Sequence, residues 1–79
     1  MSEPQAGDRL VDPRGRTIGR VDAVFADYLL VRTAGLLPVD LYVPRDQVTP
    51  DGDRRLTVNA DSREAYRAWH RPLRKAPHD

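Results

Sequence analysis

Cysteine is absent from this chain of 79 residues, and its apolar runs are all far shorter than a membrane span. The absence of cysteine excludes disulfides, thiolate nucleophiles and cysteine-based zinc sites. A secreted domain this small would often need such cross-links, so we expect a reducing compartment. A transmembrane helix needs about 20 consecutive apolar residues, and the first residues carry no signal-peptide pattern. We therefore expect a soluble cytoplasmic protein that does not engage a membrane.

Lysine is almost absent as well, since Lys75 is the one lysine among 13 basic residues. The basic and acidic residues are unevenly distributed along the chain. Up to Asp61 there are 8 basic and 10 acidic residues, whereas from Ser62 onward there are 5 and 2. A domain that binds nucleic acid over its whole surface usually shows a clearly basic composition. The composition therefore argues against such a footprint and leaves the C-terminal part as the basic region.

The length of the chain supports one domain with one small core. We place this domain at residues 7–71 and expect residues 1–6 and 72–79 to be flexible termini. A core of this size leaves little room for a deep enzymatic cleft.

Short runs rich in β-branched and aromatic residues alternate with turn residues over most of the chain. They predict strands at 8–11, 17–26, 28–33, 40–44 and 55–59, with a short turn at 45–48. The expected fold is mainly β, a small antiparallel β-barrel of five or six strands. Between Ile18 and Val21 the apolar positions change from even to odd numbers, which a flat strand does not allow. Gly19 stands at this change and predicts a β-bulge that bends the strand.

A short helix follows the last predicted strand. Asp61 and Glu64 have the spacing of a capping box, and a helix is disfavoured at the residue before Pro72. The expected apolar stripe consists of Ala65, Ala68 and Trp69, with Tyr66 beside Trp69. We expect this helix to close the barrel and Trp69 to plug its core.

The order of these segments resembles the PRC-barrel superfamily, a small barrel found in the H subunit of photosynthetic reaction centres and in a ribosome maturation factor. The matching residues are Gly7, the run GRTIGRVDAV at 15–24, DYLLV at 27–31 and YVP at 42–44. The chain looks most similar to uncharacterised stand-alone bacterial members, which share a Gly-Leu loop, here 35–37, and a final helix, here 64–69. The resemblance implies a fold, and it implies no catalytic residue and no cofactor.

Catalytic and metal-binding patterns are weak in this chain. Its only serines are Ser2 and Ser62, and neither lies beside a histidine that could act as a base. The run Asp51-Gly52-Asp53 lacks the further ligands of a calcium loop, and His70 and His78 have no fixed geometry. We expect no enzyme activity, no cofactor and no metal.

The loop before the fourth predicted strand is unusually apolar for a loop. Two interpretations remain open: the loop folds over the open end of the barrel and fills the core, or it forms an exposed interaction patch. Its apolar residues are Leu36, Leu37, Pro38 and Val39. The second interpretation predicts a non-enzymatic module for protein interaction or oligomerisation, with a protein partner or a weak homodimer.

The alternative function is a ribosome- or RNA-associated factor. It depends on basic residues spaced 4, 4 and 3 apart, which a continued helix would place on one stripe: Arg63, Arg67, Arg71 and Arg74. The simpler interpretation is that these arginines form the solvent face of an amphipathic helix. Nucleic acid is therefore the less favoured partner at this stage.

Overall fold

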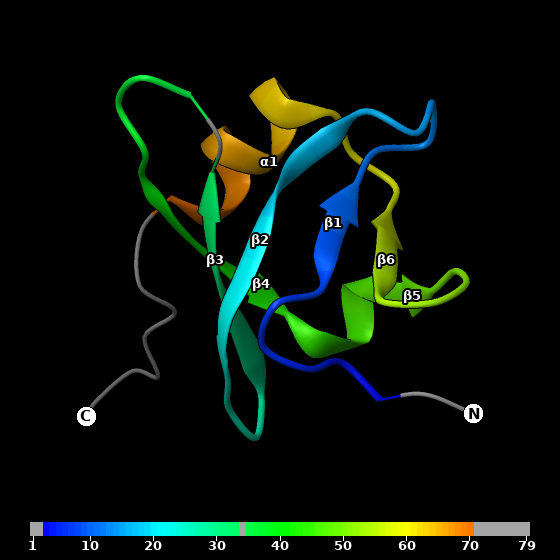
Figure 1. The fold of residues 1–79 in the computed structure, drawn as a ribbon. Coiled ribbons are helices and arrows are strands. Elements are labelled where there is room, and N and C mark those ends of the chain that lie inside the picture. The colour runs from blue at the N-terminus through cyan, green and yellow to red at the C-terminus, as the bar shows by residue number, and fades with distance from the viewer. Residues whose placement is uncertain (1–2, 34, 71–79) are drawn as a thin grey trace.

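The computed structural model describes residues 3–33 and 35–70. Along the chain lie β1 (Arg9–Val11), β2 (Thr17–Val24), β3 (Tyr28–Thr33), β4 (Asp40–Pro44), the 3-10 turn η1 (Arg45–Gln47), β5 (Val48–Pro50), β6 (Arg55–Val58) and α1 (Ser62–Trp69) (Figure 1). The expected mainly β fold with a short C-terminal helix is confirmed. The predicted domain boundaries stay a prediction, and residues 71–79 lie outside the described part.

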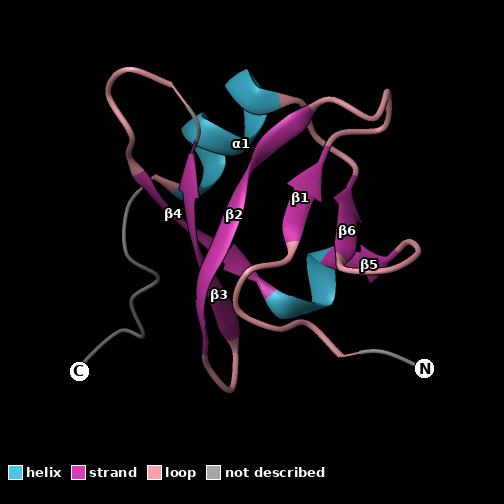
Figure 2. Ribbon diagram, in the orientation of Figure 1, coloured by secondary structure: helices cyan, strands magenta, loops and turns pink. Residues whose placement is uncertain are grey.

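The six strands form one sheet in the order β4-β3-β2-β1-β6-β5. The two edge strands, β4 and β5, are joined by η1 alone. Because so short a connection cannot span a flat sheet of six strands, the sheet must curl until its edges approach each other. Figure 2 shows this curl, with α1 lying at the upper end of the strands.

One strand pairing differs from the antiparallel barrel that the sequence predicts. Strands β1 and β6 run parallel, whereas the other four pairings of the described sheet are antiparallel. The crossing from β4 to β5 moves the chain to the far edge of the sheet, and the hairpin of β5 and β6 then brings β6 alongside β1. The apolar pattern of a strand does not encode its direction, so this pairing was not predicted.

The bulge predicted near Gly19 is present. Leu10 pairs with Gly19 and the next residue, Val11, pairs with Thr17, so Ile18 is the extra residue of β2 in this ladder. The bulge lets Ile18 join the buried core despite the change of parity that the sequence shows.

A second bulge lies further along β2 and was not predicted. Val21 pairs with Val31 and Ala23 pairs with Leu30, which leaves Asp22 as the extra residue. An exposed aspartate gives no apolar signal, so the parity argument could not locate it.

The strand β5 was also not predicted as a strand. It has three residues and pairs with β6 at the edge of the sheet. Two of its residues, Thr49 and Pro50, are exposed, so the run lacks the apolar alternation that indicates a strand. Pro50 is tolerated here because an edge strand need not donate every hydrogen bond.

The core lies inside the curled sheet and under α1. Its buried members come from every strand except β5 and from the helix: Leu10, Ile18, Val21, Leu29, Val31, Leu41, Val43, Leu56, Val58 and Ala65. Trp69 packs against this cluster while staying partly exposed. It therefore covers the margin of the core rather than plugging its centre.

The N-terminus of α1 has the predicted capping box, whereas only part of its predicted apolar stripe is buried. The Glu64 amide donates to Asp61 Oδ1 at 2.9 Å, and the Asp61 amide donates to Glu64 Oε1 at 3.0 Å. This reciprocal pair is the predicted capping box. Ala68 was expected in the apolar stripe and is exposed, because the helix presents only one residue per turn to the core.

Tyr66 was expected beside Trp69 and stacks instead on His70, with ring centroids 4.4 Å apart. The His70 ring is held there because its Nδ1 lies 2.6 Å from the Tyr66 carbonyl oxygen. A carbonyl oxygen can only accept a hydrogen bond, so Nδ1 carries the proton.

Candidate interaction surfaces

The loop that joins β3 to β4 is closed at its base by two hydrogen bonds. The Thr33 amide donates to the Val39 carbonyl oxygen, and the Val39 amide donates to Thr33 Oγ1, both at 2.9 Å. Gly35 has φ of +124°, a conformation that side chains rarely adopt. The hairpin pairing therefore continues to Val39, and residues 35–38 lie outside it.

The side chains of this loop point into solvent. Leu36 is 99% exposed and Leu37 is 86% exposed, while Pro38 and Val39 are also exposed. The interpretation that the loop fills the core is therefore wrong, because the strands and Ala65 already supply that core. We name Leu36, Leu37, Pro38 and Val39 the leucine loop.

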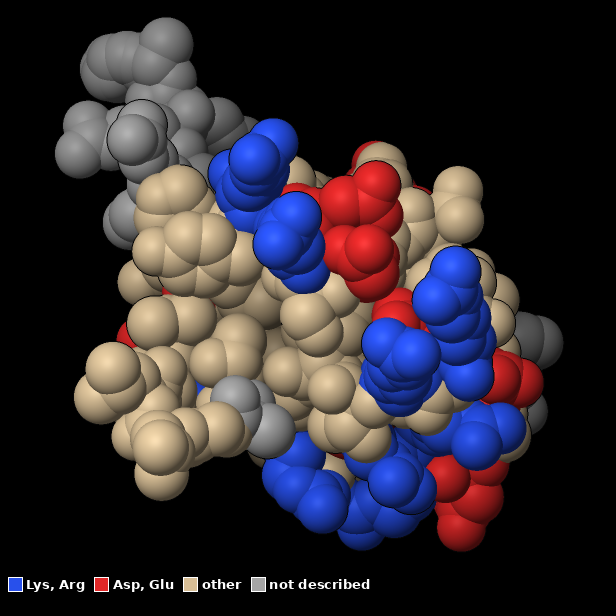
Figure 3. Space-filling model, turned by 90° about the horizontal axis from the view of Figure 1, so that it is seen from above, with Lys and Arg blue, Asp and Glu red and all other residues tan. Residues whose placement is uncertain are grey.

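Figure 3 shows the end of the molecule that carries the leucine loop and α1. Uncharged side chains fill the left and the centre of this view, whereas basic side chains gather along its lower and right margins. The apolar loop and the basic surface are thus separate regions. A partner of the loop need not be charged.

Two of the four arginines in the predicted basic stripe lie on the described part of α1, so the full stripe stays a prediction. Arg63 and Arg67 are exposed on α1, and Arg71 and Arg74 lie outside the described residues. The basic side chains over α1 border acidic ones in Figure 3, and the helix itself carries Glu64. The described part of the helix therefore presents mixed charge.

A different set of arginines comes together on the outward face of the sheet. Arg9 of β1 lies directly opposite Arg55 of β6 and Arg20 of β2, and Arg20 lies directly opposite Arg32 of β3. All four side chains are exposed, whereas their neighbours Leu10, Val21, Val31 and Leu56 are buried. We name Arg55, Arg9, Arg20 and Arg32 the arginine row.

The sequence analysis missed the arginine row because its members are far apart along the chain. Each arginine stands at an outward position next to an inward apolar residue, so its face could be read from strand alternation. Their alignment depends on the strand order, the bulges of β2 and the parallel pairing of β1 with β6. Without these, the chain up to Asp61 is simply mildly acidic.

Aromatic side chains occupy the same outward face, further along β3 and β4. Tyr28 and Leu30 alternate with buried residues on β3, and Tyr42 lies opposite Leu30 on β4. The Phe25 amide donates to the Tyr28 carbonyl oxygen at 2.9 Å, which places Phe25 opposite Tyr28 at the end of the β2–β3 hairpin. The Phe25 and Tyr28 rings stack with centroids 4.8 Å apart, and Tyr28 and Tyr42 lie 5.9 Å apart.

Asp8 and Asp12 have buried carboxylates, and both stabilise turns. Asp12 accepts the amides of Arg14 at 2.9 Å and Arg16 at 2.8 Å in the β1–β2 turn. Asp8 Oδ2 accepts a hydrogen bond from the Gln5 backbone N–H at 3.0 Å, and Asp8 Oδ1 lies 3.6 Å from Arg54 Nε. Both oxygens of Asp8 and the Oδ1 of Asp12 are engaged in these contacts.

Within residues 3–33 and 35–70, no group of three or more acidic, histidine or cysteine side chains is close enough to hold a metal ion. The described part of the chain also has no helix of the length and apolarity needed to cross a membrane.

Comparisons of this chain with protein-family models, with curated proteins and with solved structures found no match.

Proposed function

We propose that this chain is a non-enzymatic protein-association module whose leucine loop binds the same loop of a second copy. The observation that carries the proposal is the exposure of Leu36, at 99%, and of Leu37, at 86%. Adjacent exposed leucines on a loop fixed at its base form an apolar surface without a described partner inside the chain. A closed two-fold dimer is the simplest partner, because one self-complementary surface then serves both copies.

The size of the leucine loop sets the expected strength of the dimer. Burying one leucine side chain contributes roughly 1.5–3 kcal/mol, so four leucines across a two-fold axis contribute about 6–12 kcal/mol. Association costs about 4–15 kcal/mol in lost translational and rotational freedom. Even the most favourable ends of the two ranges leave only about 8 kcal/mol, which corresponds to a dissociation constant of about 1 μM, so we expect a dissociation constant in the micromolar range or weaker.

The non-enzymatic part of the proposal is supported by the engagement of the buried polar groups. Asp8 and Asp12 are occupied in turns, where they accept backbone amides. A general base has to be within reach of the proton that it abstracts, and these groups face their own backbone.

Sedimentation equilibrium over a wide concentration range tests the proposal. We expect the native chain to shift from monomer to dimer as its concentration rises, and Leu37→Asp to stay monomeric. Thr49→Asp is the matched control, because it adds the same charge at an exposed position on β5, away from the loop. A native chain that stays monomeric throughout, or a Thr49→Asp variant that dissociates equally, contradicts the proposal.

A further inference from the structure

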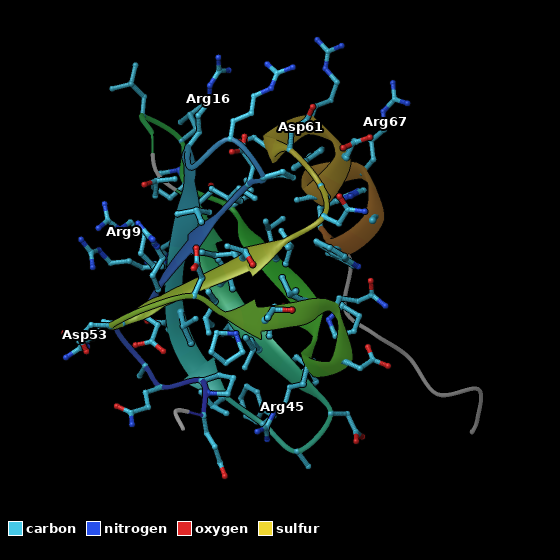
Figure 4. The ribbon with its side chains drawn as sticks, turned by 90° about the vertical axis from the view of Figure 1, so that its right-hand side faces the viewer. Arg9, Arg16, Arg45, Asp53, Asp61 and Arg67 are labelled. Atoms are coloured by element: carbon cyan, nitrogen blue, oxygen red, sulfur yellow. The ribbon has the colours of Figure 1, made fainter. Side chains whose placement is uncertain are left out.

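The arginine row crosses four adjacent strands on the outward face of the curled sheet. Neighbouring strands lie about 4.8 Å apart, so the four positions span roughly 14 Å. Figure 4 shows Arg9 projecting away from the sheet on one side of the molecule, while Arg67 lies on the helix at the other. The row is therefore a surface distinct from α1, and its Arg32 end adjoins the base of the leucine loop.

The ends of the arginine row have carboxylate neighbours. Arg32 Nε lies 3.5 Å from Asp40 Oδ1, and Arg55 Nη2 lies 3.4 Å from Asp51 Oδ2. These two carboxylates offset the charge at the ends of the row, so its uncompensated charge lies in the middle.

The middle of the row is less compensated. Arg20 donates to the Gly7 carbonyl oxygen at 3.2 Å, and the side chain of Arg9 has no hydrogen bond or ion pair within residues 3–33 and 35–70. Asp22 follows Arg20 by two residues on β2, and it lines the same shallow hollow as Arg20 and Arg32. It offsets part of the positive charge there. The middle of the row therefore keeps a net positive charge.

Like charges directly opposite each other destabilise a sheet. The arginine row therefore works against folding, and an anionic ligand would relieve the repulsion. A single small anion would neutralise only one or two of these residues. A row of four arginines on an open, convex face fits a ligand that carries negative charges at regular intervals, as a phosphodiester backbone does.

The aromatic side chains narrow the class of ligand. Phe25 is 43% exposed and stacks on Tyr28, and both lie on the same outward face as Arg20 and Arg32. Aromatic rings beside basic side chains form stacking platforms for the bases of single strands. Bases in a duplex are already stacked on each other, and an acidic peptide or an anionic membrane offers no bases to stack.

We infer that the outward face of β1, β2, β3, β4 and β6 binds single-stranded nucleic acid. The arginine row contacts successive phosphates, and Phe25 with Tyr28 and Tyr42 receives bases. This proposal uses none of the leucine-loop residues and is tested by different variants, so the two proposals stand or fall separately.

Fluorescence anisotropy of a labelled oligothymidylate of about 12 nucleotides, a length typical of such sites, tests the inference over a range of salt concentrations. We expect affinity to fall steeply with salt. The double variant Arg9→Gln/Arg20→Gln should flatten the slope of log K against log salt by about 1.4, because each lost phosphate contact in a single strand removes about 0.7. Phe25→Leu should weaken binding about tenfold with the slope unchanged.

Two control variants make the test specific. Arg63→Gln/Arg67→Gln removes the same charge from α1 and should leave both affinity and slope unchanged. Arg9→Lys/Arg20→Lys keeps the charge of the row and should restore most of the binding. Circular dichroism melts should show Arg9→Gln/Arg20→Gln to be at least as stable as the native chain, because the repulsion between opposite arginines is gone.

Three results would overturn the inference. The first is no salt-dependent binding of the oligonucleotide. The second is an equal loss of binding in the α1 control. The third is equally tight binding of duplex DNA or heparin with no effect of Phe25→Leu, which would indicate general attraction of polyanions rather than a single-strand site.

Discussion

Gly19 of β2 lies so close to β3 that a β-carbon at this position would overlap the backbone carbonyl oxygen of Arg32. The same β-carbon would lie 2.9 Å from Val31 Cγ1. A backbone oxygen held in a sheet cannot rotate aside as a flexible side chain can. Glycine is therefore required at residue 19 by the close approach of two strands beside the bulge at Ile18.

We predict that Gly19→Ala destabilises the protein by at least about 2 kcal/mol, because an added methyl group in a packed position forces the backbone to move. Urea unfolding measures this loss. Gly52→Ala is the control, since a β-carbon there meets nothing nearer than 3.9 Å and bears only the strain of φ at +89°, about 1–2 kcal/mol. A smaller loss for Gly19→Ala than for Gly52→Ala would show that the strands do not approach this closely.

We predict that Trp69→Ala costs about 2–3 kcal/mol, less than the 3–5 kcal/mol typical of a fully buried tryptophan, because Trp69 packs against the core but is partly exposed. Trp69 is the only tryptophan, so the native fluorescence reports on it alone. Its emission should be blue-shifted relative to the unfolded chain.

Tyr66→Ala is the matched control on the same helix, since Tyr66 is 45% exposed and contacts His70. It should cost less than Trp69→Ala in the same denaturation experiment. An emission maximum that does not change on unfolding would contradict the packing of Trp69 against the core.

We predict that Asp61→Ala lowers the free energy of unfolding by about 1 kcal/mol, because it removes the N-cap acceptor of the Glu64 amide. Asp61→Asn should be nearly neutral, since asparagine caps a helix about as well as aspartate. Thermal melts of the two variants decide the matter. Equal losses in both would mean that the charge of Asp61, and not its capping hydrogen bond, stabilises the helix.

Much of the fold could be predicted from the sequence because local chemistry dictates it. Strands β3 and β4 have the predicted bounds, since turn residues flank each apolar run. The capping box at Asp61 is a local signal of the same kind. The bulge at Ile18 followed from a change of parity within one strand.

The interaction surfaces were harder to predict because they depend on long-range pairing. Arg55 joins the arginine row only because β6 lies parallel to β1, and neither strand contains information about the other. The leucine loop was recognised as unusual, but its composition was equally consistent with a core and with a patch. Only the hydrogen bonds between Thr33 and Val39 show that the loop is held away from the core.

We predict that Leu36→Asp and Leu37→Asp leave the stability of the monomer within about 0.5 kcal/mol, as is usual for exposed positions. Both side chains are almost fully exposed, so a carboxylate there stays in water. Urea unfolding should be measured well below the concentration at which the native chain associates. A loss as large as that of a core variant such as Leu41→Ala would show that the loop belongs to the core.

The most direct test of the leucine loop as an association surface is a dilution series followed by two-dimensional amide NMR. The account predicts that chemical shifts of residues 36, 37 and 39 change with concentration, together with their immediate neighbours in space. The amides of β5, including Thr49, should not change. Spectra that are independent of concentration, or changes centred on β5 with none in the loop, would contradict the account.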